Sequence, residues 1–169
     1  MEQLLNVALL VNVCGEVRGR KKLQKIVHIL QEAGHPFREP FGYLHYGPYS
    51  SVLKAELDEL ISDNVGLLDE KEQQINEYSE YVYAPTEKLE GILDSLGVEK
   101  EPAWKDLAKD LSKKSPDYLE AVSTILFLRR LSFDGERLKS KFQELKPKLA
   151  NLFDDALEKA NQVVPVRAE

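Results

Sequence analysis

The first hydrophobic segment, residues 2–14, is apolar on almost every face that a helix would present. Such a helix has no wide polar side to turn toward water, so we expect it in the centre of a core. Gly15 and Gly19 follow it and interrupt the helical pattern. The sequence therefore predicts a short buried helix that ends near Cys14.

A second helix is predicted over residues 20–33, because apolar residues recur there at the i, i+3, i+4, i+7 spacing. One face carries Leu23, Ile26, Val27 and Leu30, and the opposite face carries Lys21, Lys25 and His28. Gly34 ends the pattern. We expect an amphipathic helix whose basic face lies away from the core.

Residues 36–49 cannot form a helix, because three prolines and two glycines fall within them. The aromatic run FGYLHY alternates well enough to predict one short strand that ends at Gly47 and Pro48. Ser50 or Ser51 then caps a third helix that continues to about residue 64.

Residues 66–70 and 75–84 are predicted to form two strands around a charged turn, EKEQQ. The predicted order is helix, helix, strand, helix, strand, strand. This order matches a winged helix-turn-helix domain over residues 1–84, with residues 66–84 as the wing. Three helices would share a core that a small antiparallel sheet covers at one end.

Residues 85–169 are helical in pattern throughout, which predicts a second, α-helical domain. Ser115 is expected to cap the most apolar helix of this half, with Pro116 at its first position. That helix, residues 116–131, and Trp104 suit either an internal core or the interface of a homodimer. The final residues, PVRAE, are expected to fray.

The composition is ordinary for a globular protein, with 43% hydrophobic and 31% charged residues. The 169 residues carry a formal net charge of −6, so a phosphate-binding surface would have to be local. Cys14 is the one cysteine, which excludes an intrachain disulfide and favours a reducing, cytoplasmic setting. We expect no signal peptide and no contact with a membrane, because the N-terminal apolar run is short and has no basic flank.

Positive charge is concentrated between Gly15 and Leu30, where Glu16 is the one acid. The basic residues of this segment are Arg18, Arg20, Lys21, Lys22 and Lys25. Such a cluster can bind phosphates, and it is also typical of a solvated helix face. The third helix and the wing, which would approach DNA in a winged helix, are instead acidic. They would repel phosphates, which disfavours standard duplex recognition.

Three tyrosines, Tyr43, Tyr46 and Tyr49, follow the basic helix and would suit a protein-binding patch. We expect their rings to pack over the helix junction with the hydroxyls at the surface. His28 is expected at the surface and His45 in a strand.

The sequence contains no recognised catalytic, metal or cofactor motif. Cys14 and the three histidines lack zinc-ligand spacing. No GxSxG sequence, phosphate-binding loop or dinucleotide fingerprint occurs. We therefore predict no catalytic residues, no metal and no cofactor.

The segments GEVRGRKKLQKIVHIL, FGYLHYGPYS and LKAELDEL resemble the YwgA-like uncharacterised family of Bacillus and its relatives. The combination of GRKKLQK and HYGPYS carries this resemblance, which covers the first half of the chain. More distantly, KLQKIVHIL followed by YGPYSSVL resembles the Panacea domain of the SocA-type antitoxin. That resemblance implies binding to a toxin or client protein. His28 stands where the Panacea domain usually has an aromatic residue, and the tryptophan often near its YGP turn is absent here.

These patterns predict a non-enzymatic cytoplasmic protein that binds another protein, in the manner of an adaptor or antitoxin. The hypothetical partner surface comprises Arg18, Arg20, Lys21, Lys22, Lys25, His28, Tyr43, Tyr46 and Tyr49. The alternative is a DNA-binding transcriptional regulator of the winged-helix type that uses the same basic helix. An enzyme is a third hypothesis, which a buried pocket lined by polar groups would support.

Overall fold

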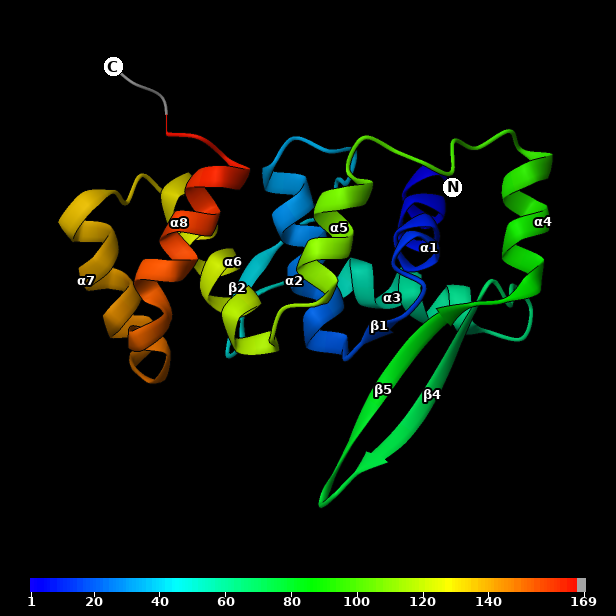
Figure 1. The fold of residues 1–169 in the computed structure, drawn as a ribbon, viewed down its shortest axis with the longest axis horizontal. Coiled ribbons are helices and arrows are strands. Elements are labelled where there is room, and N and C mark those ends of the chain that lie inside the picture. Colours follow the sequence, from blue (N-terminus) through cyan, green and yellow to red (C-terminus); the bar gives the residue numbers. More distant parts are fainter. Residues whose placement is uncertain (167–169) are drawn as a thin grey trace.

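The computed structural model of the protein describes residues 1–166, so part of the segment expected to fray lies outside the described residues. The fold is mainly helical with a small antiparallel sheet (Figure 1). In chain order the elements are α1 (Glu2–Cys14), β1 (Val17–Arg18), α2 (Arg20–Glu32), β2 (Gly42–Leu44), β3 (Gly47–Tyr49), α3 (Ser51–Ile61), β4 (Leu68–Ile75), β5 (Tyr78–Pro85), α4 (Glu87–Ser95), α5 (Lys105–Ser112), α6 (Pro116–Arg130), α7 (Gly135–Leu145), η1 (Pro147–Leu152) and α8 (Phe153–Val163).

The helices of the first half lie where the hydrophobic pattern predicts them. Helix α1 is buried over most of its second half, and α2 buries the predicted apolar face. Helix α3 ends at Ile61, somewhat before the predicted end near residue 64. The predicted caps are also confirmed, because the Ser50 hydroxyl accepts a hydrogen bond from Leu53 N at 3.1 Å and the Ser115 hydroxyl accepts one from Tyr118 N at 3.2 Å.

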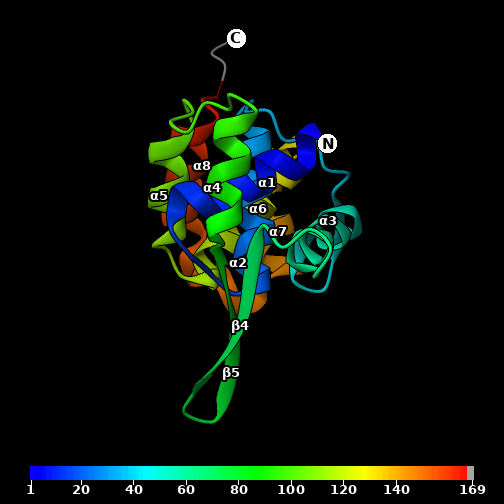
Figure 2. The ribbon, with the colours of Figure 1, turned by 90° about the vertical axis from the view of Figure 1, so that its right-hand side faces the viewer.

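The antiparallel sheet has three strands in the order β1–β5–β4. Strand β1 pairs Val17 with Tyr83, and the sequence analysis did not predict it because a two-residue strand has no detectable periodicity. Strands β4 and β5 pair from Leu68 opposite Pro85 to Ile75 opposite Tyr78, and they form a long hairpin that projects beyond the helices (Figures 1 and 2).

The predicted turn at EKEQQ is wrong. Those residues lie within the paired strand β4, and the long hairpin turns instead at Asn76 and Glu77. Asn76 has a φ of 55°, a left-handed conformation that asparagine adopts more readily than most residues. Because the hairpin projects into solvent, most of the β4 side chains are exposed and no apolar alternation marks the strand.

The prediction of one strand within residues 36–49 is also incomplete. Strands β2 and β3 form a short hairpin with Gly42 opposite Tyr49 and Leu44 opposite Gly47. His45 and Tyr46 occupy its two-residue turn, so the prediction of His45 in a strand is wrong. Gly47 makes the turn possible because its φ of 86° is unfavourable for other residues.

Buried side chains from both halves of the chain form one hydrophobic cluster. Helix α6 lies within it and packs against α2 and α8, while α5 packs against α1 and α2. Val122 and Ile125 of α6 are fully buried, so this helix belongs to the internal core. Trp104 is likewise internal and meets Phe37 edge-on, with the ring centroids 5.2 Å apart.

The homodimer and the division into units at 1–84 and 85–169 stay predictions. No helix in the described part of the chain has the length and apolar character needed to cross a membrane.

Candidate functional site

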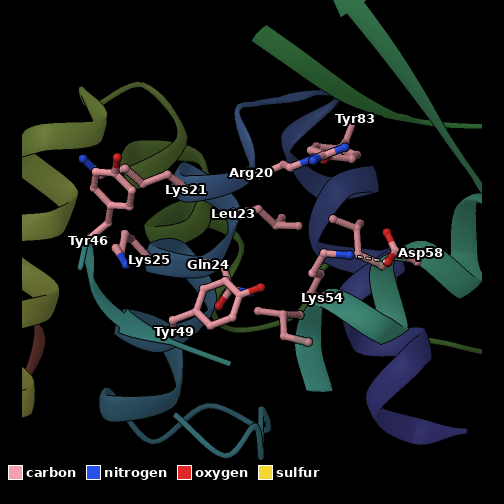
Figure 3. A pocket seen from close by; sticks show the side chains of 12 residues that line it. Arg20, Lys21, Leu23, Gln24, Lys25, Tyr46, Tyr49, Lys54, Asp58 and Tyr83 are labelled. Carbon is pink, nitrogen blue, oxygen red and sulfur yellow. Dashed lines mark hydrogen bonds and ion pairs between the residues drawn. The ribbon is translucent and has the colours of Figure 1, made fainter. Parts of the chain in front are cut away.

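A pocket of about 280 Å³ lies between α2, β3 and α3 (Figure 3). Its floor consists of the buried side chains Leu23, Leu53 and Leu57, which come from α2 and α3. Tyr49 of the short hairpin and Tyr83 of the sheet also line it. The pocket is therefore an apolar depression bounded by α2, α3, the short hairpin and the sheet.

Gln24 of α2 fixes the distance between the two helices that form the pocket. Its amide nitrogen donates to Ser50 O at 2.9 Å, and its amide oxygen accepts from Ser50 N at 2.9 Å. Both groups are buried, so losing this pair would leave backbone atoms without partners. Because Ser50 is also the cap of α3, one glutamine joins α2 to the first turn of α3.

Cations lie at both ends of the apolar floor (Figure 3). Lys21, Lys25 and Tyr46 occupy the end formed by the short hairpin, and Arg20 and Lys54 occupy the end near the sheet. Asp58 is the one acid among the described residues that line the pocket. The lining is consequently basic in a chain whose net charge is negative.

Lys25 is a charged side chain that is almost wholly buried, with 2% of its surface exposed. Its ammonium group donates to Pro48 O at 2.6 Å, which fixes β3 against α2. Burial lowers the pKa of Lys25 to about 8, because the charged form loses its hydration. One carbonyl satisfies only one of its three donors.

A buried ionic cluster on the α6 side of the short hairpin holds the hairpin in place. Glu120 of α6 lies 3.1 Å from the Lys21 ammonium and 3.0 Å from the Lys146 ammonium. Lys146 also donates to His45 O in the hairpin turn at 2.8 Å. A buried carboxylate between two ammonium groups is satisfied electrostatically, so α6 holds both the hairpin and the basic end of the pocket in place.

The sheet end of the pocket is organised around Arg20. Its guanidinium lies 3.9 Å from the centroid of the Tyr81 ring, and its Nε donates to the Tyr83 hydroxyl at 3.1 Å. Glu70 is 3.4 Å away, and half of the Arg20 side chain remains exposed. Lys54 pairs with Asp58 at 2.7 Å, and both of these side chains are also more than half exposed.

The structure brings five of the nine predicted surface residues to this pocket. They are Arg20, Lys21, Lys25, Tyr46 and Tyr49. Tyr46 is the most accessible of them, with 69% of its surface exposed, and its ring lies 5.4 Å from the Lys21 ammonium.

The other predicted residues lie elsewhere. Arg18 lies on the sheet and pairs with Glu16 and Glu80, each at 2.9 Å. Lys22 is buried, and the loss of hydration lowers its pKa. The Tyr43 hydroxyl is buried without a described hydrogen-bond partner, so the prediction that it lies at the surface is wrong.

His28 is also wrongly predicted at the surface, since only 1% of it is exposed. Its Nδ1 lies 2.6 Å from the Ser123 hydroxyl, and its ring meets Phe41 edge-on at 4.8 Å. Burial lowers the pKa of His28 to about 3, so the ring is neutral at physiological pH and packs as an aromatic side chain. Helix α6 covers the α2 face that carries it, and no local pattern in α2 indicates such a distant cover.

Sequence analysis missed Gln24, the leucine floor, Lys54 and the Glu120–Lys146 pair. One signal was present for Glu120, because an acid inside an otherwise apolar helix requires a buried partner. Gln24 gave no signal, since polar residues are ordinary on helix surfaces. In residues 1–166, no three His, Cys, Asp or Glu side chains gather as metal ligands would.

The fold and the pocket define a mainly helical protein with a small antiparallel sheet and a basic-rimmed apolar pocket. The chain belongs to the YwgA-like family. It is 34% identical over 145 residues to the uncharacterized protein YwgA of Bacillus subtilis (strain 168), an alignment that spans 85% of this chain and 86% of that relative. No protein-family model matches the chain, so the more distant resemblance to the Panacea domain rests on the residues alone.

Proposed function

We propose that the protein is a non-enzymatic, cytoplasmic binding protein that holds a segment of another protein in the pocket between α2, α3 and the short hairpin. The observation that carries this proposal is the composition of the pocket. An apolar floor, accessible tyrosines and a basic rim are features of protein-binding surfaces. The one acid among its described lining residues, Asp58, is exposed and paired with Lys54, so it does not resemble a catalytic carboxylate.

The proposed scaffold is a winged helix. The order α1, β1, α2, α3, β4, β5 supports this, as does the pairing of β1 with the second strand of the long hairpin. In this interpretation the long hairpin is the wing. The second half of the chain then acts as a support, because α6 fixes the short hairpin through Glu120.

Charge favours a protein over a DNA duplex as the partner. The exposed side chains of α3 include Asp58 and Glu59, and those of the long hairpin include Asp69, Glu72 and Glu77. These two elements would face phosphates in a winged-helix complex with DNA, and acids there would repel the duplex. The cations at the pocket lie in a depression where they suit a protein side chain better than a phosphate backbone.

The test is affinity capture from a native extract, with and without nuclease treatment, using the parent chain, Tyr46→Ala and Tyr78→Ala. Tyr78 is the matched control, because it is 62% exposed and lies at the far end of the long hairpin. We expect a defined protein that the parent and Tyr78→Ala retain and Tyr46→Ala loses. Equal capture by all three chains would reject this site, and loss of all captured material on nuclease treatment would favour the DNA alternative. Unfolding midpoints of the variants establish that each is folded.

A further inference from the structure

The volume of the pocket restricts its occupant. At about 280 Å³ it lies at the lower end of the roughly 300–1,000 Å³ range of pockets that bind drug-sized ligands. Its floor, formed by Leu23, Leu53 and Leu57, offers an apolar surface to an aromatic or branched side chain. A small pocket with an apolar floor suits an anchoring apolar side chain of a longer segment.

The charges at the two ends of the pocket restrict which side chains of the bound segment can lie beside the anchoring residue. Lys54 pairs with Asp58 at the sheet end, but both side chains are more than half exposed, and exposed pairs contribute little. Arg20 is also half exposed, at 3.4 Å from Glu70. A carboxylate brought by a ligand could therefore bind these cations without breaking a strong internal interaction.

The hairpin end offers a different kind of cation. The described partner of the Lys25 ammonium is a neutral carbonyl, Pro48 O, and the group is held where water is scarce. Its depressed pKa reflects that loss of hydration. An anion placed at this end would stabilise the charged form of Lys25 further than Glu120 does and would gain a charge-assisted hydrogen bond. Neighbouring Lys21 adds to the positive field, although Asp117 and Glu120 partly neutralise it.

Resting on the proposed function, we propose that the occupant is an acidic segment of a partner protein, with one apolar side chain on the leucine floor and carboxylates against the cations at each end. Tyr46 and Tyr49 would then enclose the anchor from the short hairpin. The whole chain has a net charge of −6, so it repels an acidic partner at long range. Recognition of such a partner therefore depends on the positive charge that is concentrated at the pocket.

The proposal is tested with a random peptide library displayed on phage and enriched on the full chain. We expect enriched peptides to carry aspartate or glutamate beside one aromatic or branched apolar residue. A synthetic peptide of that sequence should bind Lys54→Glu and Tyr46→Ala about tenfold more weakly, a loss equivalent to about 1.4 kcal/mol. Lys71→Glu is the matched control, because Lys71 is exposed on β4 away from the pocket, and it should bind like the parent.

Enrichment of neutral or basic peptides, no enrichment at all, or equal weakening by Lys54→Glu and Lys71→Glu would overturn the acidic occupant. The capture experiment separates this failure from failure of the proposed function. If Tyr46 is needed to capture a protein but no acidic peptide is enriched, the site stands and only the stated chemistry is wrong. If neither capture nor peptide binding depends on Tyr46, both proposals fail.

Raising the salt concentration should weaken the binding of the enriched peptide to the chain, because salt screens the contacts between its carboxylates and the cations. A peptide affinity that is insensitive to salt would also contradict these carboxylate contacts.

Discussion

At the scale of single residues, Glu39 and Glu56 place two carboxyl groups beside each other. Glu39 is 3% exposed, and neither Glu39 Oε1 nor Glu56 Oε2 has a described hydrogen-bond partner. Burial and the neighbouring Glu56 raise the pKa of Glu39 to about 8, so a proton held between the two carboxyl groups would satisfy both. The Gln31 amide donates to Glu39 O at 2.9 Å and accepts from Glu39 N at 2.7 Å, which fixes the backbone of Glu39.

This pair makes the stability of the fold depend on pH. The ordinary pKa of the group is 4.5, so between pH 4.5 and about 8 the folded chain binds more protons than the unfolded chain. The contribution to stability therefore falls as the pH rises through that window.

Glu39→Gln should remove this dependence, because an amide is always neutral and still donates a hydrogen bond to Glu56. We expect the variant to be more stable than the parent at pH 8 and to lose less stability between pH 5 and pH 8. Urea unfolding at the two pH values measures both quantities. Glu87→Gln, at an exposed position in α4, is the control and should follow the parent. The same pH slope in Glu39→Gln and the parent would contradict this assignment.

At the scale of elements, the short hairpin is the part of the pocket with the most specific anchoring. Lys25 fixes Pro48, Lys146 fixes His45, and Gly47 lies so close to α6 that an added Cβ would be 3.0 Å from the Thr124 hydroxyl. The position of Tyr46 and Tyr49 over the floor follows from these contacts. An element of only a few residues thus depends on two helices, α2 and α6.

Gly47→Ala should destabilise the protein by about 1–3 kcal/mol, because it combines an unfavourable φ of 86° with the contact to Thr124. Gly91→Ala is the matched control, since Gly91 lies in α4 with no atom near its added Cβ, and alanine should stabilise that helix by about 0.5–1 kcal/mol. Chemical unfolding measures both changes. Equal effects of the two substitutions would show that the hairpin is not held as described.

The sequence predicted the elements that are marked by residues within one short segment. Helices α1, α2 and α3 follow from apolar spacing and a capping serine, and five residues of the pocket follow from a basic helix beside a tyrosine-rich segment. The rest depends on contacts between distant segments. Helix α6 buries His28 from about one hundred residues away, and the short hairpin holds the buried Lys25 ammonium. Nothing within α2 distinguishes these two side chains from solvated ones. Residues 70–74 of strand β4 were predicted as a turn because their exposed polar side chains resemble a loop.

At the scale of the whole molecule, the charge is distributed unevenly. The chain is acidic overall, and the long hairpin, which projects beyond the helices (Figure 2), carries exposed acidic residues. Cations instead gather around one apolar pocket. This asymmetry predicts poor association with nucleic acid and selective association at the pocket.

The chain should therefore bind random-sequence duplex DNA more weakly than the roughly 10⁻⁴–10⁻⁶ M of ordinary nonspecific DNA-binding proteins. Fluorescence anisotropy with a labelled duplex at low and physiological salt measures this. Tight, salt-sensitive binding that Lys21→Glu and Lys25→Glu both reduce would instead support a DNA-binding regulator that uses α2.

The most direct test of the account places a photoreactive amino acid at position 46 or position 78 of the full chain and irradiates intact cells. Position 46 borders the pocket, and position 78 is equally accessible but lies at the end of the long hairpin. We predict a discrete, nuclease-resistant protein adduct at position 46 and none at position 78. An adduct only at position 78, or an adduct to nucleic acid at either position, would contradict the claim that the pocket is where this protein holds its partner.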